Sequence, residues 1–314
     1  MSKYRSKLPQ LNGKLFLTDG GIETTLIFHE GLDLPYFAAF DLLKTPEGKA
    51  ALYNYFVPHA RIARKAGLGF ILESPTWRAS ADWGKKLGYS ATAMNEVNRA
   101  SIDLMHELRA EFETAETPVV ISGCIGPRGD GYDPGAEMSR KEAQDFHAAQ
   151  AGVFASAGAD VVTSITTTNA NEAVGIVRAA QDVSMPSVIS FTVETDGRLP
   201  TGQTLKDAIA EVDRETSHGP AYYMINCAHP THFDHVLTDE PWVERIRGLR
   251  ANASRCSHAE LDQATELDHG DPVELGAQYA ALRRRHPQIT VLGGCCGTDH
   301  RHIEQIGAAC AKAA

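Results

Sequence analysis

Segments with the character of buried strands alternate along this chain with segments of helical spacing, and this alternation constrains the fold more than any other feature. The helical stretches are rich in alanine and glutamate and include residues 56–66, 93–112, 140–157 and 275–285. The expected strands are short apolar and β-branched runs at residues 15–19, 69–73, 119–122, 160–164, 187–192, 222–226, 249–252 and 290–293. Eight strand–helix units predict an α/β fold of the (β/α)8 barrel type, with a doubly wound open sheet as the alternative.

Chain length and composition agree with one α/β domain. The chain has 314 residues, of which 43% are hydrophobic and 22% are charged. Since α/β barrels often exceed about 250 residues, we expect a single domain over residues 1–314. The net charge of −10 argues against a nucleic-acid partner or an anionic membrane, because both require clustered lysine and arginine. The composition therefore favours an acidic enzyme that acts on small molecules.

Sequence features also bear on cellular location. The basic residues near Met1 are followed by no apolar stretch typical of a secretory signal, and no segment has the apolar length of a membrane span. The six cysteines are too few for a disulfide framework in a chain of this size, and a cluster of functional thiolates needs a reducing compartment. We therefore expect a cytoplasmic protein.

Two adjacent cysteines follow the last expected strand. This strand runs into the sequence Gly-Gly-Cys-Cys-Gly at residues 293–297, where the glycines allow a tight turn that presents Cys295 and Cys296. Soft thiolates favour zinc, so we interpret the pair as part of a metal site. The alternatives are a redox pair or two small buried side chains.

A third cysteine, Cys227, ends the expected strand at residues 222–226. Because the carboxyl ends of barrel strands lie on one rim, Cys227, Cys295 and Cys296 are expected to converge. Three thiolates with one open position are typical of catalytic Zn²⁺, whereas a structural site usually draws its fourth ligand from a Cys-x-x-Cys pair, which this sequence lacks. The sequence therefore predicts a zinc cofactor.

Five short motifs lie along nearly the whole chain. They are Asp-Gly-Gly-Ile-Glu-Thr-Thr-Leu at 19–26, Gly-Cys-Ile-Gly-Pro at 123–127, Ser-Phe-Thr at 190–192, Asn-Cys at 226–227 and Gly-Gly-Cys-Cys-Gly at 293–297. In this order they resemble the homocysteine S-methyltransferase family, whose zinc-dependent barrel enzymes include betaine- and S-methylmethionine-dependent members. The resemblance implies methyl transfer from an onium donor to a zinc-bound thiol, most simply homocysteine, which gives methionine.

Several strand-end residues are candidate substrate contacts, and the resemblance implies the role of one of them, Asp19. Asp19 matches a family residue at the ammonium end of the amino acid, although an aspartate here also suits a helix N-cap. Trp77 is expected to stack on the onium donor and Arg78 to hold a carboxylate, with packing and solvent exposure as the alternatives. Thr166 and Asn226 complete the candidate substrate-binding residues.

One position, Ile165, departs from the family pattern. The family usually has a glutamate there that binds the homocysteine ammonium, so Asp19, Ser164 or Thr166 must compensate, or the acceptor is a thiol without an α-ammonium. A zinc-dependent hydrolase or lyase on the same barrel is the other alternative, although three thiolates make zinc poorly acidic. The expected partners are a small-molecule thiol and a methyl donor, and the oligomeric state stays open.

The remaining residues of interest receive plainer interpretations. The turn-rich segments 126–135 and 195–202 follow strands and are either substrate loops or solvent turns. His229 and His235 are placed outside the metal ligands. The other cysteines are interpreted as structural; they are Cys124, Cys256 and Cys310.

Overall fold

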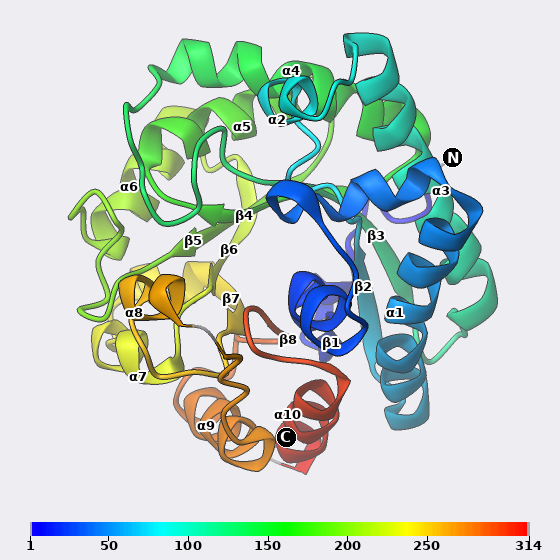
Figure 1. Ribbon diagram of the computed structural model, residues 1–314. Helices are drawn as coiled ribbons and strands as arrows, with labels where there is room; N and C mark the ends of the chain where they lie inside the picture. The colour runs from blue at the N-terminus through cyan, green and yellow to red at the C-terminus, as the bar shows by residue number, and fades with distance from the viewer. Residues whose placement is uncertain (1, 265, 313–314) are drawn as a thin grey trace.

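The computed structural model describes residues 2–264 and 266–312, and its central feature is a closed barrel of eight parallel strands (Figure 1). The strands, in chain order, are β1 Phe16–Leu17, β2 Gly69–Glu73, β3 Val119–Ile125, β4 Val161–Thr167, β5 Ser187–Thr192, β6 Pro220–Asn226, β7 Ile246–Ala251 and β8 Val291–Gly294. β8 pairs with β1 through Phe16 and Val291, which closes the barrel. The predicted (β/α)8 TIM barrel is confirmed, and the open-sheet alternative is wrong.

Helices surround the barrel as an outer ring (Figure 1). They are α1 Pro46–Ala66, α2 Ala81–Lys86, α3 Ala91–Phe112, α4 Arg140–Ala157, α5 Ala170–Asp182, α6 Leu205–Thr216, α7 Pro230–Phe233, α8 His258–Gln263, α9 Pro272–Arg285 and α10 His300–Lys312. A π-helical turn, η2, spans Thr24–His29. The 3-10 turns are η1 Pro9–Asn12, η3 Pro35–Phe37, η4 Ala39–Lys44, η5 Asp234–Val236 and η6 Pro241–Arg245. α1 starts earlier than the predicted residue 56 because the Thr45 side chain caps it by accepting a hydrogen bond from the Gly48 backbone N–H at 3.0 Å.

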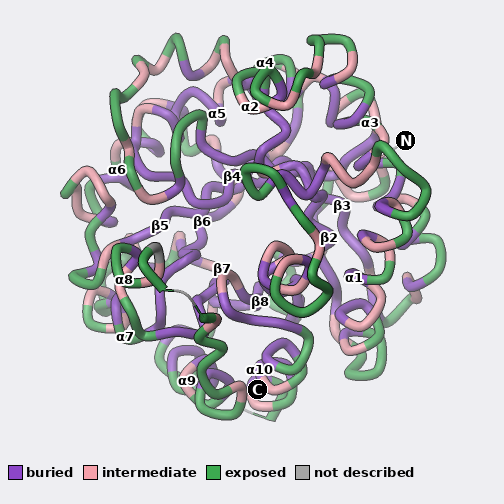
Figure 2. The backbone as a smooth tube through the Cα atoms, in the orientation of Figure 1, coloured by how far each residue is buried: buried purple, intermediate pink, exposed green. Residues whose placement is uncertain are grey.

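The strands are buried on nearly every residue, as expected for a parallel sheet covered by helices (Figure 2). The larger apolar core lies between strands and helices. A smaller cluster takes residues from seven of the strands, which can meet only inside the barrel; it comprises Leu8, Phe16, Ile71, Val120, Val161, Val188, Tyr222, Met224 and Val291. Since these side chains fill one part of the interior, polar chemistry is left to the carboxyl ends of the strands.

β4 has an irregular end that shapes the functional site. Its register against β5 shifts between Ser164 and Thr167, and Thr166 has a left-handed backbone with φ 63°. A bulge of this kind re-aims side chains at a barrel rim. The predicted end of this strand at residue 164 is therefore too early, because β4 resumes pairing at Thr167.

In the described part of the chain, no helix is long and apolar enough to cross a membrane. The extent of the single domain, residues 1–314, stays a prediction.

Candidate active site and metal centre

Three cysteine sulfur atoms meet at the carboxyl rim of the barrel. Cys227 follows β6, whereas Cys295 and Cys296 follow β8. Their Sγ atoms all lie within 4.8 Å of one another, and they form the group of metal-capable side chains found among the described residues. The predicted convergence is therefore present in the structure, with neither His229 nor His235 in the group.

Two of these sulfurs, those of Cys227 and Cys295, are joined in a disulfide, which differs from the expected set of free thiols. The barrel brings their Cα atoms to 5.4 Å, an ordinary spacing for a disulfide. Cys296 remains free, with its Sγ 4.0 Å from that of Cys227. Metal binding and the disulfide use the same sulfurs, so only the reduced protein offers three thiolates. That donor set fits zinc with one open position.

Asn226 is the fully buried residue that supports this cluster. Its Oδ1 accepts hydrogen bonds from the Thr166 backbone N–H at 2.9 Å and from the Ser190 hydroxyl at 2.6 Å. Its Nδ2 donates to Thr166 Oγ1 at 2.9 Å. Thr166 and Cys227 both have positive φ, 63° and 53°, which costs about 1–3 kcal/mol for non-glycine residues. The hydrogen bonds of Asn226 to Thr166 link the ends of β6 and β4 and offset this strain.

The same two polar residues contact the sulfurs. Thr166 Oγ1 lies 3.7 Å from Cys227 Sγ, and Asn226 Nδ2 lies 3.9 Å from Cys295 Sγ. Both candidate substrate residues are therefore beside the metal site. The contacts found here orient cysteines, and direct contact with a substrate stays a prediction.

Asp19 is buried and already has charged and polar partners. Arg250, on β7, places Nη1 2.9 Å from Asp19 Oδ1, and the Tyr55 hydroxyl donates to Asp19 Oδ2 at 2.8 Å. Arg250 also donates to the Gly20 and Gly294 carbonyls, each at 3.2 Å. A substrate ammonium would have to compete with these groups, so the predicted role of Asp19 gains no support here. Neither Arg250 nor Tyr55 was anticipated from the sequence.

Arg78 is buried between two tryptophan rings. Its guanidinium lies 4.0 Å from the ring centroids of both Trp77 and Trp83, and Nη1 donates to the Gly129 carbonyl at 2.8 Å. Only 5% of the residue is exposed, so the solvent-facing alternative is wrong. Burial lowers the pKa of Arg78, which the nearby Asp130 partly opposes.

Trp77 lies at the edge of the site. Its Nε1 donates to the Ile165 carbonyl at 3.2 Å. A Cβ built on Gly131 would lie 3.1 Å from the Trp77 ring and 2.9 Å from Thr166, so these groups crowd the same spot. Arg78 already occupies a face of the indole ring, and the role of Trp77 in donor binding stays a prediction.

Tyr132, which the sequence analysis missed, caps the sulfur cluster. Its hydroxyl lies 3.2 Å from Cys296 Sγ, and its ring packs against His258 at a tilt of 33°, with centroids 4.1 Å apart. His258 Nε2 in turn hydrogen-bonds the Cys227 carbonyl. Burial raises the pKa of Tyr132, so the hydroxyl keeps its proton and is available to donate to Cys296 Sγ. At least this part of segment 126–135 therefore faces the site.

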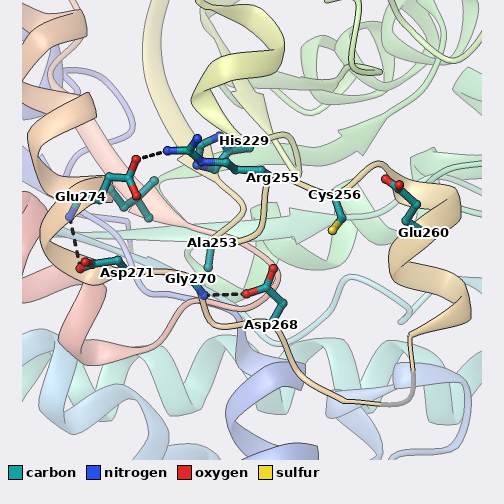
Figure 3. Close-up of a pocket in the computed structure, with 10 residues that line it drawn as sticks. His229, Ala253, Arg255, Cys256, Glu260, Asp268, Gly270, Asp271 and Glu274 are labelled. Atoms are coloured by element: carbon teal, nitrogen blue, oxygen red, sulfur yellow. Dashed lines mark hydrogen bonds and ion pairs between the residues drawn. The ribbon is translucent and has the colours of Figure 1, made fainter.

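A separate cavity of about 340 Å³ lies beside this rim (Figure 3). His229 and Arg255 line it, together with four carboxylates: Glu260, Asp268, Asp271 and Glu274. Cys256 is exposed at its wall rather than packed in the core, which corrects the structural interpretation. The two other isolated cysteines, Cys124 and Cys310, are buried as predicted.

A closed parallel barrel with three cysteine sulfurs at its carboxyl rim defines an α/β-barrel enzyme with a metal-capable site. The sequence model of the family described as homocysteine S-methyltransferase matches residues 16–310, and the chain belongs to this family. It is therefore a methyltransferase of the thiol-directed class.

Individual relatives are similar over most of their length. "Homocysteine S-methyltransferase 1" of Zea mays is 24% identical, and the match covers 94% of this chain and 94% of the relative. "Homocysteine S-methyltransferase YbgG" of Bacillus subtilis (strain 168) is 24% identical, and the match covers 70% of this chain and 74% of the relative.

Two solved structures of the homocysteine methyltransferase MmuM from Escherichia coli share the fold. The oxidized form gives a TM-score of 0.75 at 18% identity, covering 96% of this chain and 98% of the other. The metallated form gives a TM-score of 0.72 at 17% identity, covering 95% of this chain and 96% of the other.

Proposed function

We propose that this protein is a zinc-dependent S-methyltransferase that moves a methyl group from an onium donor, such as S-methylmethionine or betaine, to a thiol. Homocysteine, which would give methionine, is the first-choice acceptor because the relatives carry its name. The observation that carries the proposal is the meeting of three cysteine sulfurs within 4.8 Å at the barrel rim.

The reduced chain would hold zinc through Cys227, Cys295 and Cys296. Zinc held there would lower the pKa of a coordinated acceptor thiol from about 8.5, so that the sulfur would be a thiolate at neutral pH. In the transfer, a sulfur–methyl bond forms while the bond from methyl to the onium atom breaks, and the electron pair leaves with the now neutral donor. No side chain has to act as acid or base, because the donor arrives already charged.

The protein contributes rigidity and enclosure. Asn226 and Thr166 fix the cysteine side chains through the contacts described above. Tyr132 covers Cys296 from the β3–α4 segment. Covering the rim in this way limits water near the reacting sulfur, which strengthens the electrostatic interactions there.

A cytoplasmic location forms part of the proposal. The disulfide between Cys227 and Cys295 removes two ligands, so the proposed zinc-bound enzyme needs a reducing compartment. In this scheme, two-electron reduction of the disulfide by a thiol reductant of that compartment, which is itself oxidised to a disulfide, yields the two cysteine thiols before metal binds.

A second acceptor class remains a candidate: thiols that lack an α-ammonium. Two observations favour it. Ile165 is 8% exposed and provides no charge, and Asp19 is already paired with Arg250. The zinc hydrolase or lyase alternative has no comparable support, because the metal-capable group consists of sulfur donors.

The direct test uses reduced protein supplied with zinc. Homocysteine and 4-mercaptobutanoate are offered as acceptors, each with S-methylmethionine or betaine as donor, and the methylated thiol is quantified. We expect methylated thiol from at least one pair. Donor breakdown without any methylated thiol, or no reaction with any pair, would contradict the proposal.

A further inference from the structure

Glu23 is a carboxylate at the mouth of the barrel, directly before η2. Its segment is locked against the turn that follows β8. Gly297 N donates to Thr24 Oγ1 at 3.0 Å, and Gly21 N donates to the Thr298 carbonyl at 3.0 Å. A Cβ on Gly21 would lie 2.6 Å from the Cys295 carbonyl oxygen, which shows how closely the two backbones approach. The backbone therefore holds Glu23 beside the cysteines.

Glu23 interacts electrostatically with charged and titratable groups of the site, in keeping with the position of its backbone beside the turn after β8. Its charge acts on Arg78 and on two groups of the sulfur cluster, Tyr132 and Cys296. Burial raises the pKa of Glu23 to about 7, and Asp19 adds to this rise whereas Arg78 and Arg250 oppose it. Part of its surface still reaches solvent, as expected for a side chain inside a concave mouth.

The carboxylates near Glu23 differ from it in being paired or covered. Asp19 is bound by Arg250 and Tyr55. Glu73 is 6% exposed. Glu23 has no hydrogen bond or ion pair with any side chain within residues 2–264 and 266–312. It is therefore the acidic group of the mouth that is free to receive a cation.

Arg78 carries the opposite charge at the same mouth, where its Nη2 also lies 3.6 Å from Asp130 Oδ2. Glu23 and Arg78 act on each other electrostatically, and the buried Arg78 Nε has no partner among the described residues. A carboxylate and a guanidinium at one barrel mouth match the head group of an α-amino acid, whose ammonium and carboxylate share one carbon. In homocysteine this carbon is two methylene groups from the sulfur, so binding of both ends requires the head-group site and the cysteines to share one mouth, as the backbone contacts of the Glu23 segment with the turn after β8 favour.

We propose that Glu23 binds the α-ammonium group of an amino-acid thiol acceptor, while Arg78 binds its carboxylate. The inference rests on the proposed function and deepens it. Glu23 takes over a contact that Ile165, which is uncharged, does not provide. An arriving ammonium favours the ionised carboxylate, so Glu23 is charged in the complex. Glu23 is thereby a specificity-determining residue for acceptors that carry an ammonium.

The test compares Glu23→Gln with native protein, using homocysteine and 4-mercaptobutanoate as acceptors at saturating donor. The variant loses the charge-assisted hydrogen bond to the homocysteine ammonium. This loss should lower kcat/KM for homocysteine about ten- to hundredfold. The value for 4-mercaptobutanoate should change less than about threefold. Glu30→Gln, at an exposed position just after η2, is the matched control and should alter neither value. Zinc content should be unchanged in both variants.

Calorimetric binding of both thiols without donor separates this inference from the proposed function. Glu23→Gln should weaken homocysteine binding by a similar factor and leave 4-mercaptobutanoate binding unaffected. Equal losses for both thiols, or no loss for homocysteine, would overturn the assignment. If native protein transfers no methyl group, the proposed function fails, and the binding comparison still decides the role of Glu23.

Discussion

Asn226 and Thr166 are hydrogen-bonded to each other twice. The Thr166 backbone N–H donates to Asn226 Oδ1 at 2.9 Å, and Asn226 Nδ2 donates to Thr166 Oγ1 at 2.9 Å. This pairing joins the ends of β4 and β6, where Thr166 and Cys227 both have positive φ. The position of Cys227 therefore depends on a strand other than its own.

Replacing Asn226 with alanine should lower the free energy of unfolding by about 2–4 kcal/mol, because the Thr166 N–H and the Ser190 hydroxyl lose a buried acceptor. Urea unfolding of the reduced, metal-free protein measures this. Ser190→Ala removes one bond and keeps the link to Thr166, so it should cost about 1 kcal/mol. Equal effects of the two substitutions would show that the Asn226–Thr166 pair adds no stability.

Removing the Tyr132 hydroxyl should weaken zinc binding. In Tyr132→Phe the ring can still pack against His258, but the donor 3.2 Å from Cys296 Sγ is lost. A hydrogen bond to a thiolate contributes about 1.5–3 kcal/mol, so zinc affinity should fall about tenfold or more. Competition with a chelating dye measures it, and unchanged affinity would mean that Tyr132 only covers the site.

Much of the fold follows from the sequence because strand and helix periodicity are local signals. All eight strands occur where predicted, and the bounds of β2 and β5 match the prediction. The end of β4 was missed because its extension depends on pairing with β5 after a bulge. Similarly, the early start of α1 depends on the Thr45 cap.

The site was predicted less fully than the fold. Cysteines at strand ends carry their own signal, and their convergence follows from barrel geometry. Arg250 and Tyr132 carry no such signal, since Arg250 reaches Asp19 past the intervening strand β8 and Tyr132 reaches Cys296 over a sequence separation of 164 residues. The disulfide was likewise not foreseen, because it requires two cysteines 68 residues apart to face each other.

The donor site can be tested at Trp77, which lies next to Thr166 and Ile165. Loss of a cation–π contact in Trp77→Leu should raise the KM for the onium donor about three- to tenfold and affect the acceptor KM less. Trp83→Leu is the matched control, because Trp83 covers Arg78 at the same distance and its Nε1 has no hydrogen-bond partner among the described residues. Equal changes in both variants would show that Trp77 acts only through Arg78.

The buried Glu73 should make stability depend on pH. Burial raises its pKa from 4.5 to about 7, and Arg250 partly opposes this rise. The folded protein therefore keeps a proton that the unfolded chain releases, so stability falls as pH rises from about 4.5 to 7. This contribution amounts to about 3 kcal/mol.

Glu73→Gln removes that titration and should reduce the loss of stability between pH 5 and pH 8. Thermal unfolding of the reduced protein at both values measures the change. Glu304→Gln, at an exposed position on α10, should keep the native pH dependence. An unaltered pH dependence in Glu73→Gln would show that Glu73 does not titrate in this range.

The central claim is that three thiolates hold zinc for methyl transfer, and Cys296→Ala tests it most directly. In reduced protein we expect about one zinc per chain and methylation of a thiol by both the native form and Cys256→Ala, whose cysteine is exposed and outside the group. Cys296→Ala should retain little zinc and lose transfer. Stoichiometric zinc with full transfer activity in Cys296→Ala would contradict the account.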